Sequence, residues 1–234
     1  MSNALVQLHD VRSKRGDFDL HIPDWTVQPG QVVGLVGPNG VGKTTLLRLL
    51  AGMDAHQSGT ISVLGMNPMT DFVAVRSRCA FMSDEQALFG MRISKLLQFM
   101  SGYYPTWDDD HVGELLERFE IDPKANSGAL SRGQGTRLRL LIAMAFRPDI
   151  LLLDEPGAGL DLAGRRKLIK SVIEIAGSGE RSVIISSHQL GDVERICDEL
   201  LVLNNGQVLR QGTAEELILD GQTLEEAMLT WGAA

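Results

Sequence analysis

The chain has 234 residues, an apolar content of 44% and a formal net charge of −8. The apolar content is enough for a folded core, and the negative charge argues against a general nucleic-acid-binding protein, which usually carries a basic surplus. No basic stretch followed by an apolar one opens the sequence, and no apolar run approaches the roughly 18 residues that span a membrane. We therefore expect a folded chain without a nucleic-acid partner that does not cross a membrane, although it could dock on a protein that does.

The first thirty residues predict short strands and turns, and an apolar strand follows at 32–36. The next nine residues fit the phosphate-binding pattern G-x-x-x-x-G-K-[ST]: Gly37, Pro38, Asn39, Gly40, Val41, Gly42, Lys43, Thr44 and Thr45. Since a helix-prone run follows at 46–51, backbone N–H groups and a positive helix end should face the phosphates. Lys43 is expected to reach the β- and γ-phosphates, and the Thr44 hydroxyl to hold Mg²⁺.

Further strands are predicted at 60–64 and 79–82, and from about residue 85 to 147 the apolar residues follow a helical spacing. Within this region Leu130-Ser131-Arg132-Gly133-Gln134 precedes a long helix-prone run at 135–146. Such an entry to a helix offers a hydroxyl, free N–H groups and a positive dipole end to an anion. On local grounds alone, an ordinary helix cap by Ser131 is the simpler interpretation.

Two carboxylates, Asp154 and Glu155, follow the apolar strand predicted at 150–153. Ligands of open α/β sheets lie outside the carboxyl ends of the strands, so both side chains are placed where a nucleotide would bind. Asp154 is expected to bind Mg²⁺ through water, and Glu155 to polarise the water that attacks the γ-phosphate. Without the phosphate loop, a strand that ends in charged surface residues would explain this pattern equally well.

His188 follows the buried strand predicted at 182–185, at the same edge of the sheet as Asp154, and could hydrogen-bond the γ-phosphate. A single histidine is more often structural, so this role depends on the other motifs. Helices are predicted after Asp161 and after Gln189, and a hairpin joins 200–204 to 207–210 around Asn205-Gly206. Apolar strands that alternate with helices predict an α/β fold with a mainly parallel sheet and helices on both faces, with the helical region 85–147 as a smaller lobe.

Taken in order, these motifs resemble the nucleotide-binding subunit of ATP-binding cassette (ABC) transporters over essentially the whole chain. Residues 37–45 match the Walker A loop, 84–86 fall at the Q-loop, and 130–134 match the signature usually written LSGGQ. Residues 150–155 match Walker B with its catalytic glutamate, 159–161 match the D-loop, and His188 matches the switch histidine. A weaker resemblance at 103–108 is to the branch that serves ABC-2-type exporters.

The resemblance implies a P-loop ATPase fold with an amino-terminal antiparallel β portion, in which residues 1–84 and 148–234 form the core and 85–147 an inserted helical subdomain. It implies an ATPase that uses ATP and Mg²⁺, with Lys43, Glu155 and His188 as catalytic residues. It also implies a homodimer or heterodimer of such subunits, in which Ser131, Gly133 and Gln134 of one subunit face the nucleotide held by the other. The expected partners are separate membrane permease chains, which places the protein peripherally on the cytoplasmic face of the cell membrane.

Three departures from the family pattern fall at candidate site residues. Position 132 is arginine where the signature has glycine, and this side chain is expected to point away from ATP. The Q-loop glutamine aligns with Asp84, whereas Gln86 lies two residues later, so either residue could meet the Mg²⁺. The aromatic residue that stacks on adenine should fall near Arg15, which leaves Arg15 itself or Phe18 for that contact.

Two other functions fit part of the sequence. A soluble ABC ATPase that acts on ribosomes or DNA would usually carry two cassettes or a long coiled-coil insert, and neither is present in this sequence. A small-molecule kinase with a phosphate loop would leave the signature segment without a function. An ATPase that powers transport, in the direction of export, is therefore the preferred hypothesis.

Overall fold

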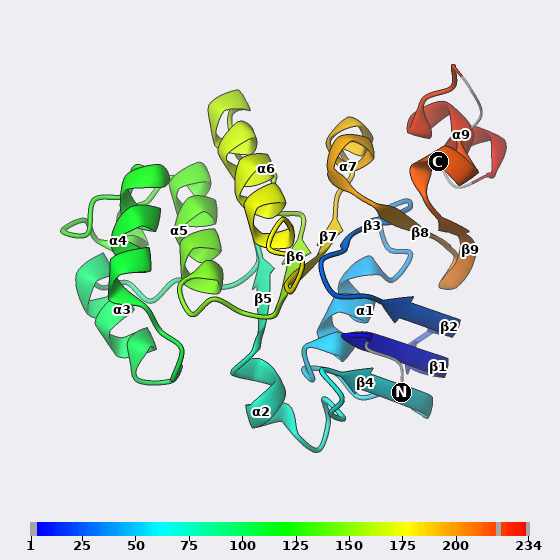
Figure 1. The fold of residues 1–234 in the computed structure, drawn as a ribbon, viewed down its shortest axis with the longest axis horizontal. Helices are drawn as coiled ribbons and strands as arrows, with labels where there is room; N and C mark the ends of the chain where they lie inside the picture. Colours follow the sequence, from blue (N-terminus) through cyan, green and yellow to red (C-terminus); the bar gives the residue numbers. More distant parts are fainter. Residues whose placement is uncertain (1–3, 219–220, 233–234) are drawn as a thin grey trace.

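A computed structural model of the chain describes residues 4–218 and 221–232. It contains a nine-stranded sheet with the strand order β4-β1-β2-β9-β8-β3-β7-β6-β5 (Figure 1). The predicted α/β fold is confirmed: β3, β5, β6, β7 and β8 run parallel, while β1, β2 and β4 form an antiparallel portion. The strands are β1 (Val6–Arg15), β2 (Phe18–Val27), β3 (Val32–Val36), β4 (Ser58–Val63), β5 (Cys79–Ser83), β6 (Ile150–Asp154), β7 (Ser182–Ser186), β8 (Glu199–Asn204) and β9 (Gln207–Gly212).

The parallel strands are buried on both faces, which explains their nearly continuous apolar sequence. Successive residues of β6 point to opposite faces, so Ile150 and Leu152 join one core and Leu151 and Leu153 the other. The first core is shared with α1 and the antiparallel strands, and the second with the helical region and α6. The helices are α1 (Lys43–Leu50), α2 (Phe72–Arg76), α3 (Ile93–Ser101), α4 (Asp109–Arg118), α5 (Arg132–Met144), α6 (Leu162–Ala176), α7 (Leu190–Ile196), α8 (Ala214–Leu217) and α9 (Leu224–Thr230).

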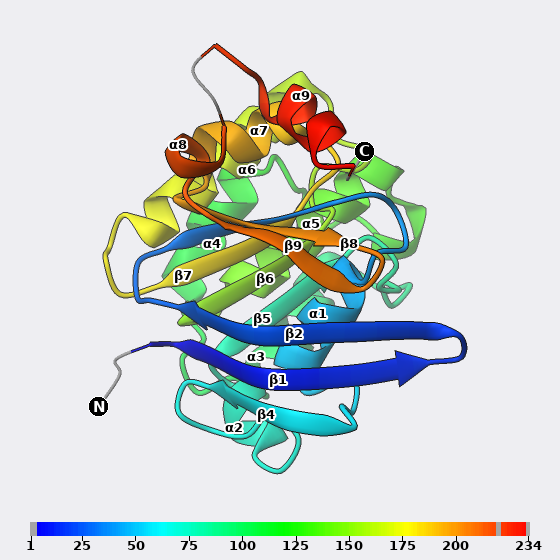
Figure 2. The same cartoon turned by 90° about the vertical axis from the view of Figure 1, so that its right-hand side faces the viewer.

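The strands β1 and β2 are ten residues long, where the sequence predicted short strands. Asp10 interrupts the alternation of β1 with a positive φ of 43°, and the register against β4 shifts between His9 and Arg12. A bulge of this kind breaks the two-residue pattern without ending the strand. Figure 2 shows these strands beside the β8–β9 hairpin, to which β2 pairs in parallel through His21.

The predicted hairpin is confirmed, because Asn204 pairs with Gln207 across Asn205 and Gly206. Both turn residues have positive φ, of 47° and 76°, as a tight turn between two strands of this twist requires. A methyl group on Gly206 would lie 2.0 Å from the carbonyl oxygen of Asp19, so only glycine fits where the turn meets β2.

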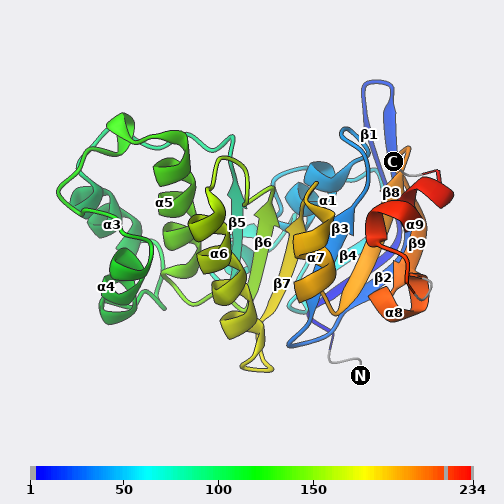
Figure 3. The ribbon, with the colours of Figure 1, turned by 90° about the horizontal axis from the view of Figure 1, so that it is seen from above.

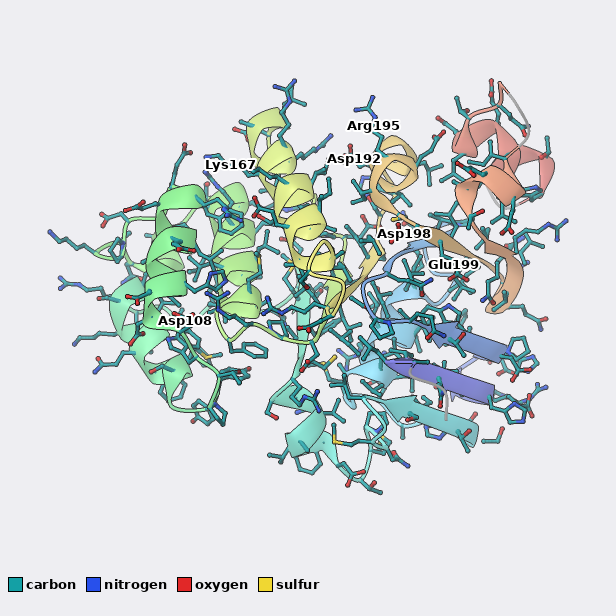
Figure 4. The ribbon with its side chains drawn as sticks, viewed as in Figure 1. Asp108, Lys167, Asp192, Arg195, Asp198 and Glu199 are labelled. Atoms are coloured by element: carbon teal, nitrogen blue, oxygen red, sulfur yellow. The ribbon has the colours of Figure 1, made fainter. Side chains whose placement is uncertain are left out.

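The helical region lies beyond β5, at one end of the sheet (Figure 3). Asp108 caps α4 by accepting a hydrogen bond from the His111 N–H, as is favourable at a helix N-terminus (Figure 4). The Lys167 ammonium on α6 lies 2.7 Å from the Glu120 carboxylate just after α4 (Figure 4). This ion pair links the helical region to a helix that packs on the sheet.

The sequence did not predict the short helices α2, α8 and α9. In α9, Thr223 and Glu226 form a capping box, and Leu224 and Met228 pack on β8 and α7. These helices are too short for a helical period to be recognised in the sequence. Helices of this length are stabilised mainly by tertiary packing. Among residues 4–218 and 221–232, no helix is both long enough and apolar enough to cross a membrane.

Candidate active site

The phosphate loop joins β3 to α1 through three glycines with positive φ. Gly37, Gly40 and Gly42 have φ values of 143°, 82° and 106°, a region that side chains rarely tolerate. A methyl group on Gly37 would lie 2.2 Å from the carbonyl oxygen of Leu203, and one on Gly42 would lie 2.8 Å from the Leu20 side chain. The close approach of β8 and β2 therefore imposes glycine at two positions of the loop.

Lys43, the first residue of α1, is only 7% exposed. Its Nζ donates to the carbonyl oxygens of Gly37 and Pro38, at 2.6 and 2.9 Å, so the side chain curls back over its own loop. Burial lowers the pKa of Lys43, while the charges of Glu155 and Asp154 oppose this shift. A partly desolvated ammonium held in this position is well suited to bind phosphate oxygens.

A cleft of about 180 Å³ opens over this loop. It brings together residues from the phosphate loop, from β2 and from the end of β6, which lie far apart in the sequence. The lining residues are Phe18, Asn39, Gly40, Gly42, Lys43, Thr44, Thr45, Asp154 and Glu155.

Asp154 ends β6 and lies directly beside α1. The Thr44 Oγ1 donates to its carboxylate at 2.8 Å, and the buried Ser186 Oγ donates to Oδ1, also at 2.8 Å. The Thr44 and Asp154 side chains supply only oxygen atoms, which suits a hard cation such as Mg²⁺ that completes its coordination with phosphates and water. Among the residues that the structure describes, no group of three or more His, Cys, Asp or Glu side chains forms a separate metal site.

Glu155 has a positive φ of 50°, which ends β6 in a sharp turn. Its N–H donates to Ser186 Oγ at 3.0 Å, and its carboxylate reaches His188, where Oε2 lies 2.6 Å from Nδ1. The His188 N–H also donates to Oε2, at 3.3 Å. The turn thus places a carboxylate at the cleft and fixes it from the neighbouring strand.

Ser186 is the residue of this site that the sequence analysis missed. It pairs with Asp154 in the register of β6 and β7, and it binds both the Asp154 carboxylate and the Glu155 backbone. The sequence feature that could have indicated its role is a serine at the end of an apolar strand, two residues before His188. Its importance depends on the register between the two strands, which the sequence alone does not specify.

We expect Ser186→Ala to lower kcat for ATP hydrolysis about tenfold, because groups that orient a functional carboxylate typically contribute this much. Ser182→Ala is the matched control, since Ser182 is equally buried at the other end of β7 and donates to the Gln28 carbonyl oxygen. Steady-state ATPase assays should show the control within twofold of wild type. Equal losses in the two variants would assign Ser186 a purely structural role.

The signature segment forms the cap of α5. Ser131 Oγ accepts from the Gln134 N–H at 3.3 Å, and the Gln134 side chain accepts from the Ser131 N–H at 2.9 Å. A methyl group on Gly133 would lie 2.7 Å from the carbonyl oxygen of Gly159, so glycine is required there by the packing of this chain alone. The three residues do not line the cleft over the phosphate loop, and their contact with nucleotide stays a prediction.

The remaining predicted ligands lie in different surroundings. Phe18 lines the cleft, with its ring against Gly42, whereas the exposed Arg15 lies 3.6 Å from the Asp54 carboxylate. Gln86 donates to the Phe81 carbonyl oxygen and accepts from the Ser83 N–H, and Asp84 binds side chains of α5. A metal contact by Asp84 or Gln86, and an adenine contact by Arg15 or Phe18, stay predictions.

Comparison with solved structures supports the fold. The structure of an ATP-binding subunit of an ABC transporter superposes with a TM-score of 0.91, at 23% sequence identity, over 97% of this chain and 99% of the other.

The sequence comparisons extend this similarity. The chain is 34% identical to the probable multidrug ABC transporter ATP-binding protein YbhF of Escherichia coli, over 93% of this chain but only 39% of YbhF. It is 31% identical to the Nod factor export ATP-binding protein I of Cupriavidus metallidurans, over 92% of this chain and 73% of that protein. The family model described as ABC transporter matches residues 20–158. The chain therefore belongs to the ABC transporter family and carries the family's ATPase domain.

Proposed function

We propose that this protein is the ATP-hydrolysing subunit of a membrane exporter and catalyses the reaction ATP + H₂O → ADP + phosphate. The observation that carries the proposal is the convergence of Lys43, Asp154 and Glu155 on one cleft. A phosphate cradle, oxygen ligands for a cation and a carboxylate that can accept a proton are the groups that phosphoryl transfer to water requires.

Each residue has a distinct role in this reaction. Lys43 and the loop N–H groups bind the phosphates, and Thr44 and Asp154 would hold Mg²⁺, which neutralises phosphate charge when bound. Glu155 accepts the proton of the attacking water. His188 holds the Glu155 carboxylate and stabilises the γ-phosphate.

The proposal includes a second ABC ATPase subunit, identical or different. Ser131, Gly133 and Gln134 lie outside the cleft of their own chain, so a partner cassette packed head to tail would bring them to its nucleotide. The functional unit is then residues 1–234 as one ABC ATPase domain, with 1–84 and 148–234 as its core and 85–147 as its helical subdomain. Export is proposed because one relative is named as an export protein and another as a probable multidrug transporter.

An apolar groove supports a permease partner. It measures about 370 Å³ and lies between β5 and the helices α3 and α5, with the segment 86–89 along one side. A row of exposed aromatic side chains extends from the groove. Phe89 packs edge-on against Phe99, and Phe99 packs edge-on against Tyr103. A partner helix of a membrane permease would cover these rings, and the segment after β5 would transmit its movement to the nucleotide.

Membrane fractionation of the native host tests this proposal. The wild-type chain should sediment with membranes, and Phe89→Ser, which removes a 60% exposed ring at the groove, should shift it to the supernatant. Leu229→Ser is the matched control, since Leu229 is 63% exposed on α9, and it should remain with the membranes. A wild-type chain found entirely in the supernatant would contradict the transport function.

A further inference from the structure

Two of the departures from the ABC sequence pattern contact each other. Arg132, the arginine in the signature segment, donates to Oδ2 of Asp84 from both Nε and Nη2, at 3.0 and 2.8 Å. Asp84 stands at the Q-loop position, 48 residues earlier. Because the two residues carry opposite charges, the two departures from the family pattern form an ion pair.

The Arg132 charge stands at an unfavourable place in the helix. It is the first residue of α5, whose amino-terminal end already carries partial positive charge, and the first turn contains no acidic residue. Asp84, only 20% exposed, supplies the missing carboxylate from the end of β5. The ion pair therefore neutralises the start of the signature helix from outside that helix.

Two further residues of α5 bind the same carboxylate. The fully buried Thr136 has its Oγ1 3.1 Å from Asp84 Oδ1 and 3.3 Å from the carbonyl oxygen of Ala158. Arg139 lies 3.4 Å from Oδ1 and donates from Nε to the Gln86 carbonyl oxygen at 2.6 Å. Both oxygens of Asp84 thus face donors on α5.

The D-loop joins this cluster through glycine. A methyl group on Gly159 would lie 3.0 Å from Cγ of Arg132, so the arginine stem packs directly on the D-loop backbone. Gly133 also lies against the D-loop, so close to the Gly159 carbonyl oxygen that a side chain at position 133 would not fit. The contacts of Arg132 therefore connect three segments: the Q-loop, the signature helix and the D-loop.

We propose that Asp84 and Arg132 are positioning residues, which hold the amino-terminal end of α5 and the D-loop in the arrangement that closes over ATP bound to a second subunit. This inference rests on the proposed function. Neither residue lines the cleft of its own subunit, so the ion pair acts on turnover in the closed dimer and leaves the first binding of ATP unchanged. Asp84 is then occupied by α5 and does not ligate Mg²⁺.

A double-mutant cycle tests this pairing. Arg132→Gln and Asp84→Asn should each lower kcat about three- to tenfold, and the double variant should lose no more than either single variant, as coupled residues do. The dissociation constant of a fluorescent ATP analogue should stay within twofold of wild type in all three variants. Arg132→Lys, which retains the charge, should recover most of kcat.

Arg78→Gln is the matched control. Arg78 and Asp149 form an ion pair with a 2.9 Å contact at the other end of β5, just before β5 and β6 begin. This variant should keep the wild-type kcat. A comparable loss in the control would show that an ion pair at either end of β5 has the same effect, and would overturn the proposal.

Two other results would overturn it. Losses that multiply in the double variant would show that the residues act independently. A raised Mg²⁺ requirement in Asp84→Asn but not in Arg132→Gln would assign Asp84 to the metal. Glu155→Gln, assayed in parallel, distinguishes a failure of the proposed ATPase mechanism from a failure of the ion-pair proposal. If this variant hydrolyses ATP at the wild-type rate, the proposed mechanism is wrong. If it is inactive and the losses of Arg132→Gln and Asp84→Asn multiply in the double variant, only the ion-pair proposal is refuted.

Discussion

Glu155→Gln is expected to lower kcat for ATP hydrolysis by about 10²- to 10⁴-fold, the usual contribution of a general base. The amide has nearly the same shape as the carboxylate and can keep the contact with His188, but it cannot accept the proton of the attacking water. ATP binding should remain, because Lys43 and the glycine loop are unchanged. Phosphate release and ATP affinity, measured on the same preparation, test both parts.

The same variant should accumulate the ATP-bound dimer, because in the proposed dimer it is hydrolysis that separates the subunits. Size-exclusion chromatography with ATP and Mg²⁺ should show a dimer that wild type forms only transiently. Glu180→Gln is the control, since Glu180 is an exposed carboxylate just before β7, and it should behave as wild type. A Glu155→Gln chain that stays monomeric and turns over normally would refute the assignment of the base.

Lys43→Ala should weaken ATP binding by about 10- to 100-fold, the size expected when a hydrogen bond to a charged group is lost. Here the expected loss is in affinity itself, in contrast to Glu155→Gln, because the proposed role of the ammonium is to bind the phosphates. The dissociation constant of ATP, measured by calorimetry, checks this. Lys14→Ala, at an exposed position of β1, should leave the affinity unchanged, and an affinity for Lys43→Ala within a few-fold of wild type would contradict the role of the loop.

The parts of the site that depend on local sequence were predictable. The glycine loop was recognised because its spacing and its strand–helix context are specific. The placement of His188 at the same edge of the sheet as Asp154 followed from two apolar strands that end in polar residues, since neighbouring parallel strands end at the same edge of a sheet. The direct contact between His188 and Glu155 was not predicted.

The parts that depend on tertiary contacts were not predictable. The contribution of Ser186 requires the register between β6 and β7, and the pairing of Arg132 with Asp84 requires the packing of α5 against β5. The sequence predicted β1 too short, because Asp10 interrupts the alternation of buried and exposed residues along this continuous strand. The helices α2 and α9 form where tertiary burial compensates for their short length.

The claim that two subunits build each ATP site is tested most directly by mixing defective chains. Ser131→Arg and Lys43→Ala are each expected to be inactive alone. In their heterodimer both defects fall on one composite site, and the other site combines an intact phosphate loop with an intact signature helix. When both substitutions are joined in one chain and this chain is paired with wild type, each composite site contains one defect instead.

The measurement is ATPase activity per heterodimer, with the two chains carrying different tags so that heterodimers are isolated. The account predicts partial activity from Ser131→Arg paired with Lys43→Ala, and clearly less from the doubly substituted chain paired with wild type. Equal activity from the two heterodimers would contradict it, because Ser131 would then act on the nucleotide of its own subunit or on none.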